Sequence, residues 1–289
     1  MVPSALGSMN DIVARLVAKQ LSQQLGQSIN IDNQAGSNGT TAADSVAKSA
    51  PDGYTLFLGN EATQATNIHL KKLFPYDPLT DFTPLASLAE DHLVLIAHPS
   101  LPAKNVAELV EHAKKNKITY ASIGAGSSYH LAGVLLGSRA GAKMIHAEYV
   151  NVAEATNALF DNKAQIMFLS GIVAKRHVGS GKAKALAIAD AKPYAPFGDL
   201  APVGATLPGF ALNGWFGLFA PAKLPPAITA RLNDEINKAL AANDVKSRLG
   251  PALLLLTPTG GKSEELAAML KDDSAKRAGL IKAAGIEPD

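Results

Sequence analysis

Two short loops rich in glycine and serine carry the residues of this chain best suited to bind a small molecule. Gly7-Ser8-Met9-Asn10 precedes a predicted helix that starts at Asp11, and Gly124–Ser128 precedes a predicted helix that holds His130. The first turn of a helix exposes unpaired backbone N–H groups with a partial positive charge, which suits an anion such as a carboxylate. Taken singly, each loop is better explained by helix capping. Two such loops together predict a ligand site.

The known enzyme and cofactor motifs are incomplete. No Gly-x-Ser-x-Gly turn is present for a hydrolase nucleophile. Gly260-Gly261-Lys262-Ser263 resembles the end of a phosphate loop, but Leu256 stands where the first glycine is required. Gly124-Ala125-Gly126 is only half of a dinucleotide motif, and no two histidines share a helix face with a carboxylate at metal spacing. We therefore expect no cofactor and no metal.

Composition narrows the class of protein further. The chain has 289 residues, of which 47% are hydrophobic and 18% charged, and its formal net charge is +2 with no cysteine. This charge is too small for a protein that neutralises phosphates, so no nucleic-acid partner is expected. The absence of cysteine excludes disulfides and thiolate chemistry. Apolar runs such as Leu253–Leu256 are far shorter than a membrane span, so we expect no membrane insertion.

Predicted strands and helices alternate along almost the whole chain, which is typical of an α/β protein with largely parallel sheets. The length favours roughly two units of about 100–200 residues each. The predicted strands cover residues 28–33, 54–59, 88–98, 119–122, 143–148, 164–169, 184–189 and 215–220. The predicted helices cover residues 11–25, 41–49, 106–115, 130–140, 153–160, 172–178, 227–243, 245–249 and 263–284.

Several strings in the chain resemble one known family, the extracytoplasmic solute receptors of the tripartite tricarboxylate transporter system, or Bug family. The resemblance spans the chain, and the order of the strings is more specific than any one of them. They are Gly7–Arg15, Asp32–Gly39, Ala50-Pro51-Asp52-Gly53-Tyr54-Thr55-Leu56, Pro75-Tyr76-Asp77-Pro78, Tyr120–Gly133, Trp215–Pro221, Arg231-Leu232-Asn233 and Lys282–Ile286.

The resemblance implies a type II periplasmic binding protein fold, in which two lobes close on a ligand. Residues 1–99 with 221–289 would form the first lobe and residues 100–220 the second. Hinge crossings would lie near His98-Pro99 and Ala220-Pro221. The implied ligand is a small carboxylate, and the implied contacts come from both loops and their neighbours: Ser8, Met9, Asn10, Asn60, Thr63, Ser127, Ser128, His130, Tyr149 and Ser170.

The chain departs from the family pattern at three places near these residues. Ser4-Ala5-Leu6 replaces an entry rich in proline and glycine, Tyr149-Val150-Asn151 replaces Tyr-Lys-Gly, and Phe168-Leu169-Ser170 replaces Phe-Asp-Asn. The loss of an acidic side chain and the gain of Leu169 predict a distal pocket of altered shape and polarity. An aromatic or partly apolar carboxylate is therefore one hypothesis for the ligand.

The start of the chain is also shorter than the family pattern, which has a signal peptide and a complete first strand before Val2-Pro3. We interpret the sequence as a further trimmed mature chain or a misassigned gene start. A version extended by about six strand-forming residues is expected to be more stable, because a missing strand leaves backbone groups unpaired.

The resemblance thus implies a periplasmic, monomeric, non-enzymatic receptor that delivers a carboxylate to the membrane subunits of a transporter. One alternative is a ligand sensor whose closed form engages a signalling partner. Another is an enzyme that uses Ser127 or Ser128 with His130, although no carboxylate is placed to orient the histidine. The effector domain of a cytosolic regulator would also need a DNA-binding segment, and none is visible.

Overall fold

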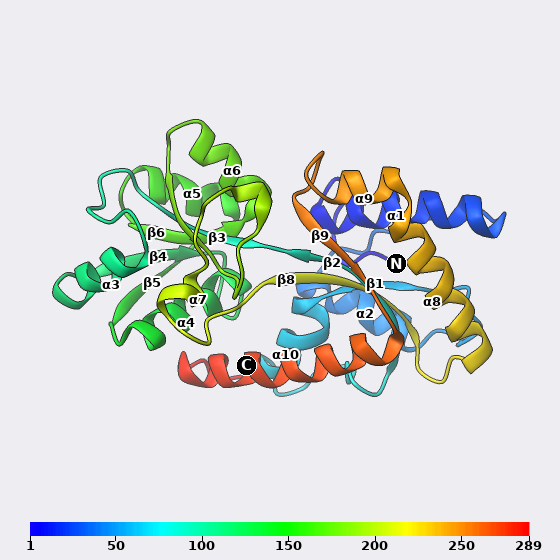
Figure 1. Ribbon diagram of the computed structural model, residues 1–289. Helices are drawn as coiled ribbons and strands as arrows, with labels where there is room; N and C mark the ends of the chain where they lie inside the picture. Colours follow the sequence, from blue (N-terminus) through cyan, green and yellow to red (C-terminus); the bar gives the residue numbers. More distant parts are fainter. Residues whose placement is uncertain (289) are drawn as a thin grey trace. The chain divides into compact units, whose positions relative to one another are not determined.

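The computed structural model describes residues 1–288, and its contacts group the chain into two compact units, each built around its own sheet (Figure 1). Unit 1 contains Met1–Glu90 and Trp215–Gly279, and unit 2 contains Asp91–Gly214 and Leu280–Ile286. The chain first passes from unit 1 to unit 2 between Glu90 and Asp91. The sequence analysis placed this crossing later, near His98-Pro99. The lobe assignment from the sequence stays a prediction.

Unit 1 contains a four-stranded sheet in the order β1 (Phe57–Asn60), β8 (Gly214–Pro221), β2 (Phe82–Asp91) and β9 (Leu256–Gly260). Strands β1 and β8 run antiparallel, with Phe57 opposite Phe219. Two apolar clusters use alternate residues of β1, since Leu58 belongs to one and Phe57 to the other. The helices of this unit are α1 (Met9–Leu25), α2 (Thr40–Ala47), α8 (Pro226–Ala241), α9 (Asn243–Leu249) and most of α10 (Ser263–Ala283).

Unit 2 contains a five-stranded sheet in the order β5 (Met144–Glu148), β4 (Ile118–Ser122), β6 (Ile166–Ser170), β3 (Leu93–Ala97) and β7 (Lys184–Ile188). Strand β4 is parallel to β5 and β6, whereas β3 is antiparallel to β6 and β7. Its helices are α3 (Val106–Lys115), α4 (Ser128–Ala140), α5 (Val152–Phe160), α6 (Gly171–Gly179) and the short α7 (Val203–Thr206).

Three expectations about the strands were wrong. The sheets are mixed rather than largely parallel, because β1 and β3 run against their neighbours. The predicted strand 88–98 is two strands that break at His92, and β2 and β3 belong to different sheets. The predicted strand 28–33 forms only an isolated bridge at Asn33, and β9 was not anticipated.

The first two residues are hydrogen-bonded on both sides. Val2 donates to the Asp32 carbonyl at 2.8 Å, and its own carbonyl accepts from Gln34 at 2.9 Å. On the other side Leu58 donates to the Met1 carbonyl at 3.0 Å. The greater stability expected of an extended chain stays a prediction. Within residues 1–288, no helix has both the length and the apolar composition needed to cross a membrane.

Candidate ligand-binding site

In unit 1 the predicted anion loop leads directly into α1. Gly7 has φ 80°, a conformation that favours glycine, and Ser8 forms the N-cap. The Ser8 hydroxyl accepts from the Asp11 N–H at 3.3 Å and lies 2.6 Å from the hydroxyl of Ser4. Ser8 is therefore a capping residue whose hydroxyl is already engaged within the loop.

Asp11 is the centre of a hydrogen-bond network that fixes this loop. Its buried carboxylate accepts from the Gly7 N–H at 2.9 Å, from Arg15 Nε at 2.9 and 3.0 Å, and from Asn33 Nδ2 at 3.0 Å. Asn33 Nδ2 also donates to the Ser4 carbonyl at 3.0 Å. Burial alone raises the pKa of Asp11, but the hydrogen bonds from Arg15, Gly7 and Asn33 outweigh it, so the pKa is lower than usual. The carboxylate is therefore ionised and paired at neutral pH.

The network leaves two backbone donors of α1 available to a ligand. The Asp11 N–H meets the Ser8 hydroxyl, and the Ile12 N–H meets the Ser8 carbonyl at 3.0 Å. The N–H groups of Met9 and Asn10 precede any intrahelical acceptor and have no hydrogen-bond partner among the described residues. These two groups are the donors of the helix start that the sequence predicted, and their contact with an anion stays a prediction.

Asn60 and Thr63 lie beside this helix end. Asn60 Nδ2 donates to Asn10 Oδ1 at 3.3 Å, which joins the end of β1 to α1. Thr63 is buried in a π-helical turn, and its N–H donates to Asn60 Oδ1 at 3.0 Å. Asn60 thus contacts the start of α1 directly, whereas Thr63 contacts Asn60 and fixes its side chain.

In unit 2, sheet topology gathers the remaining predicted residues. The carboxyl ends of the parallel strands β4, β5 and β6 lie at one edge of the sheet, the usual position of ligands in such sheets. Strand β4 continues into a loop in which Gly124 and Gly126 have φ 121° and 78°. The Ser127 hydroxyl caps α4 by accepting from the His130 N–H at 3.2 Å and donates to the Gly124 carbonyl at 2.8 Å. Ser128, the next predicted contact, is the first residue of α4.

His130 is buried behind the loop, and its predicted contact with a ligand stays a prediction. Its Nδ1 accepts from the Gly126 N–H at 3.0 Å, and its ring stacks on that of His146, with centroids 3.8 Å apart. Burial and the neighbouring His146 lower the pKa of His130 to about 4. The imidazole is therefore neutral under ordinary conditions.

Tyr149 and Ser170 occupy the same edge of the unit 2 sheet. The Tyr149 N–H donates to the Ser122 carbonyl at 3.0 Å, and its half-buried side chain packs against the core of the unit. Ser170 ends β6 and is buried, and its hydroxyl donates to Asp91 Oδ1 at 2.8 Å. Asn151, one of the departures from the family pattern, caps α5 by accepting from the Glu154 N–H at 2.9 Å.

Leu169 does not shape a distal pocket, which corrects the sequence-based hypothesis. Its side chain is fully buried in the unit 2 core, where β6 pairs with β3 at Val94. Side chains alternate along a strand, so Leu169 faces the core while its neighbours face the other way. Leu169 therefore gives no support for an apolar ligand.

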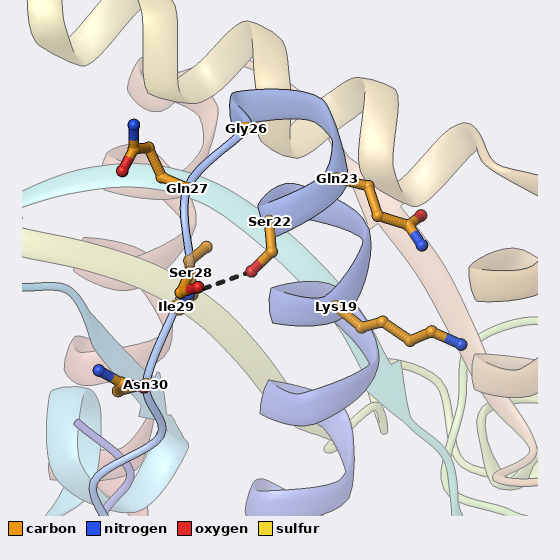
Figure 2. Close-up of a pocket in the computed structure, with 8 residues that line it drawn as sticks. All are labelled: Lys19, Ser22, Gln23, Gly26, Gln27, Ser28, Ile29 and Asn30. Carbon is orange, nitrogen blue, oxygen red and sulfur yellow. Dashed lines mark hydrogen bonds between the residues drawn. The ribbon is translucent and has the colours of Figure 1, made fainter.

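A separate surface hollow of unit 1 contains none of the predicted residues. Figure 2 shows Ser22 bonded across it to the backbone of Ile29, at 3.1 Å, with Lys19 and Gln23 extending from the same helix. Its lining is mostly polar and contains no acidic side chain and no aromatic ring: Lys19, Ser22, Gln23, Gly26, Gln27, Ser28, Ile29 and Asn30. We assign it no ligand. In the part of the chain that the structure describes, no three His, Asp or Glu side chains gather at a metal-binding distance.

The comparison with protein families decides the identity of the chain. Residues 13–286 match the family described as the tripartite tricarboxylate transporter family receptor, TctC. The chain belongs to this family. Its members are periplasmic solute-binding receptors rather than enzymes, and the α/β architecture with two sheets is that of the two-lobed type II binding proteins.

Relatives and solved structures agree with the family assignment. Protein BugT of Bordetella pertussis (strain Tohama I) is 30% identical over 289 residues, which is 98% of this chain and 88% of BugT. The structure of R. palustris Rpa4515 with adipate is 30% identical, with a TM-score of 0.84 over 100% of this chain and 97% of that one. MatC (Rpa3494) from Rhodopseudomonas palustris with bound malate is 31% identical, with a TM-score of 0.78 over 97% of both chains.

Sequence reasoning missed the residues that hold the loops in shape. Asp11 and Arg15 lie within a string used for the family resemblance, and their spacing of four residues on one helix face was a usable signal for an ion pair. Nothing in the sequence linked Asn33 to Ser4, or His146 to His130, because these contacts join distant segments.

Proposed function

We propose that this receptor captures a small organic carboxylate between its two units and delivers it to the membrane subunits of a tripartite tricarboxylate transporter. The observation that carries the proposal is the pair of available N–H groups at Met9 and Asn10, held in place by buried Asp11. The solved structures of similar proteins with adipate and with bound malate support a carboxylate ligand. The chain would act in the periplasm as a monomer.

The available donors are sufficient for useful affinity without a free arginine. Hydrogen bonds to a charged group contribute about 1.5–3 kcal/mol each, and a helix N-terminus adds about 0.3–1 kcal/mol. A micromolar dissociation constant corresponds to about 8 kcal/mol. Donors from the two loops, Ser8–Asn10 and Ser127–Ser128, would reach this value together if both contact the same carboxylate. Closure of the two units on the ligand would then supply the form that the transporter recognises.

The single tryptophan of the chain offers a direct binding assay. Trp215 is 5% exposed, its Nε1 donates to Asp273 Oδ2 at 2.8 Å, and it is the first residue of unit 1 after Gly214. If the units close on a ligand, the surroundings of this residue change. We expect a saturable shift in tryptophan emission when adipate or malate is added.

Trp215→Phe is the control for this assay. It should remove the optical signal and leave the affinity measured by calorimetry within about threefold, because the ring lies in the apolar core rather than in the loops. If neither emission nor heat responds to any member of a panel of aliphatic, amino-acid and aromatic acids, the proposed function is wrong.

A further inference from the structure

The stacked histidines of unit 2 are joined to both ends of its glycine loop. His130 Nδ1 accepts from the Gly126 N–H at 3.0 Å. The other ring, that of His146, has its Nε2 2.6 Å from the Ser122 hydroxyl, and that hydroxyl lies 3.4 Å from the Gly124 carbonyl. The two rings are almost parallel, with an interplanar angle of 11°. The pair therefore contacts the loop at Gly126 directly and at Gly124 through Ser122.

We propose that His130 and His146 are positioning residues that hold the loop Gly124–Ser127 in the shape that presents the start of α4 to a carboxylate. The proposal rests on the proposed function and assigns the pair no contact with the ligand. The direction of one hydrogen bond carries it. A backbone N–H can only donate, so His130 Nδ1 must be unprotonated, and the neutral ring carries its proton on Nε2.

The surroundings of the pair keep His130 in this state. Strands β4, β5 and β6 pack against α4. The titratable side chains they bring toward the rings are Tyr120 from β4, and His146 and Glu148 from β5. Burial lowers the pKa of both histidines, His146 lowers that of His130 further, and Glu148 acts in the opposite direction on His146. With the pKa of His130 at about 4, the bond to Gly126 persists across neutral and mildly acidic pH.

His146 provides the second connection to the loop, through Ser122, which His130 alone does not make. Met144, His146 and Glu148 are every second residue of β5 and therefore share one face of the strand. Met144 and His146 both contact α4, so this face lies toward that helix. His146 therefore fills the space between the sheet and the ring of His130 while its Nε2 holds Ser122. Loss of this ring would leave the Ser122 hydroxyl with only its 3.4 Å contact to the Gly124 carbonyl. It would also remove the nearer of the two rings that stack on His130.

Nuclear magnetic resonance of the imidazole groups tests the inference without any ligand. We expect His130 to be the Nε2–H tautomer, to titrate near pH 4, and to protect the Gly126 amide from hydrogen exchange. An Nδ1–H tautomer, or a midpoint near the ordinary value of about 6.5, would overturn the proposal. This outcome is independent of whether a carboxylate binds, so failure of the proposed function is distinguished from failure of the inference.

Three variants then separate positioning from simple packing, with adipate as the probe at pH 7.5. His130→Asn keeps an acceptor oxygen near the Nδ1 position and should bind within about threefold of the unmodified protein. His130→Phe keeps a ring for stacking but has no acceptor, and should bind at least tenfold more weakly and lose protection of the Gly126 amide. The matched control is His112→Asn, at a half-buried position of α3 outside the loop, and it should change neither the affinity nor the protection of the Gly126 amide.

The comparison of the two His130 variants decides the matter. Wild-type affinity in His130→Phe, with the fold verified by circular dichroism, would contradict the proposal. So would an equal loss in His130→Asn and His130→Phe, because the restored acceptor would then have no effect. If both variants fail to fold, the tautomer and titration of the unmodified protein still confirm or overturn the inference.

Discussion

Asp11→Ala is expected to lower the free energy of unfolding by about 2–4 kcal/mol and to weaken carboxylate binding at least tenfold. The stability loss follows because the substitution removes a 2% exposed carboxylate that accepts from Gly7, Arg15 and Asn33. Arg15 is 47% exposed, so water can solvate it afterwards, and we place the loss below that of a fully buried pair. Binding weakens because the Gly7 N–H and Asn33 no longer fix the loop that presents Met9 and Asn10.

Urea denaturation and calorimetry with adipate measure the two effects separately. The control is Asp244→Ala, which removes an exposed carboxylate four residues before Arg248 and should cost less than about 1 kcal/mol. Asp11→Asn keeps an acceptor oxygen and should lie between the two. An Asp11→Ala variant as stable as the control would show that the network does not hold the loop.

The lowered pKa of Asp11 also determines how the free energy of unfolding changes in acid. The pKa of Asp11 is lower in the folded chain than in the unfolded chain, so the unfolded state binds protons first as pH falls. Its stabilising contribution is complete above the unfolded value of about 3.9 and is lost as pH falls through the lower folded pKa. Unfolding measured from pH 6 to pH 3 should show a shallower decline in Asp11→Asn than in the unmodified protein.

Gly133→Ala is expected to destabilise unit 2 by about 1–3 kcal/mol although alanine favours helices. A Cβ at Gly133 would lie 2.2 Å from Tyr120 Cε2, closer than side chains approach. Tyr120 is buried and its ring stacks on that of His146, with centroids 5.1 Å apart. The ring can therefore move only by disturbing the histidine pair, and overpacking outweighs the gain in helix propensity.

Thermal unfolding checks this prediction, with Gly279→Ala as the matched control. Gly279 lies within α10, and a Cβ there would meet nothing within 4 Å, so the substitution should be neutral or stabilise by up to about 1 kcal/mol. The melting temperature of Gly133→Ala should fall by several degrees. Equal shifts in the two variants would contradict the packing argument.

Local patterns in the sequence predicted most elements but not how they join. The capping roles of Ser8 and Ser127 could be predicted because capping depends only on neighbouring residues. Both serines cap their helices in the structure. The break at His92 could not be predicted from the sequence. Residues on its two sides pair in different sheets, and this pairing depends on strands that are distant in the chain. Leu169 was misassigned for a related reason: every residue of β6 is buried, so the apolar sequence of this strand does not show that Leu169 packs in the core of unit 2.

The candidate site divides in the same way. The helix start at Ser8 could be predicted because a helix carries its cap and its first donors in consecutive residues, whereas its contact with a ligand stays a prediction. His130 could be found from its spacing to Ser127, but its role could not, since Gly126 occupies its Nδ1 and His146 covers its ring. Contacts that join distant segments, such as Asn33 with Ser4 and His146 with His130, leave no local signature in the sequence.

Isothermal titration of the unmodified protein with adipate and with adipamide, its uncharged diamide, tests the central claim most directly. The two molecules have the same length and differ in charge, so they separate recognition of a carboxylate from general pocket filling. A carboxylate accepts stronger hydrogen bonds from helix N–H groups than a neutral amide does, and it also gains from the partial positive charge of the helix start. We predict 1:1 binding of adipate or another carboxylate of the panel in the micromolar range, and none of the matched amide. Equal binding of acid and amide, or no binding of any acid, would contradict the account.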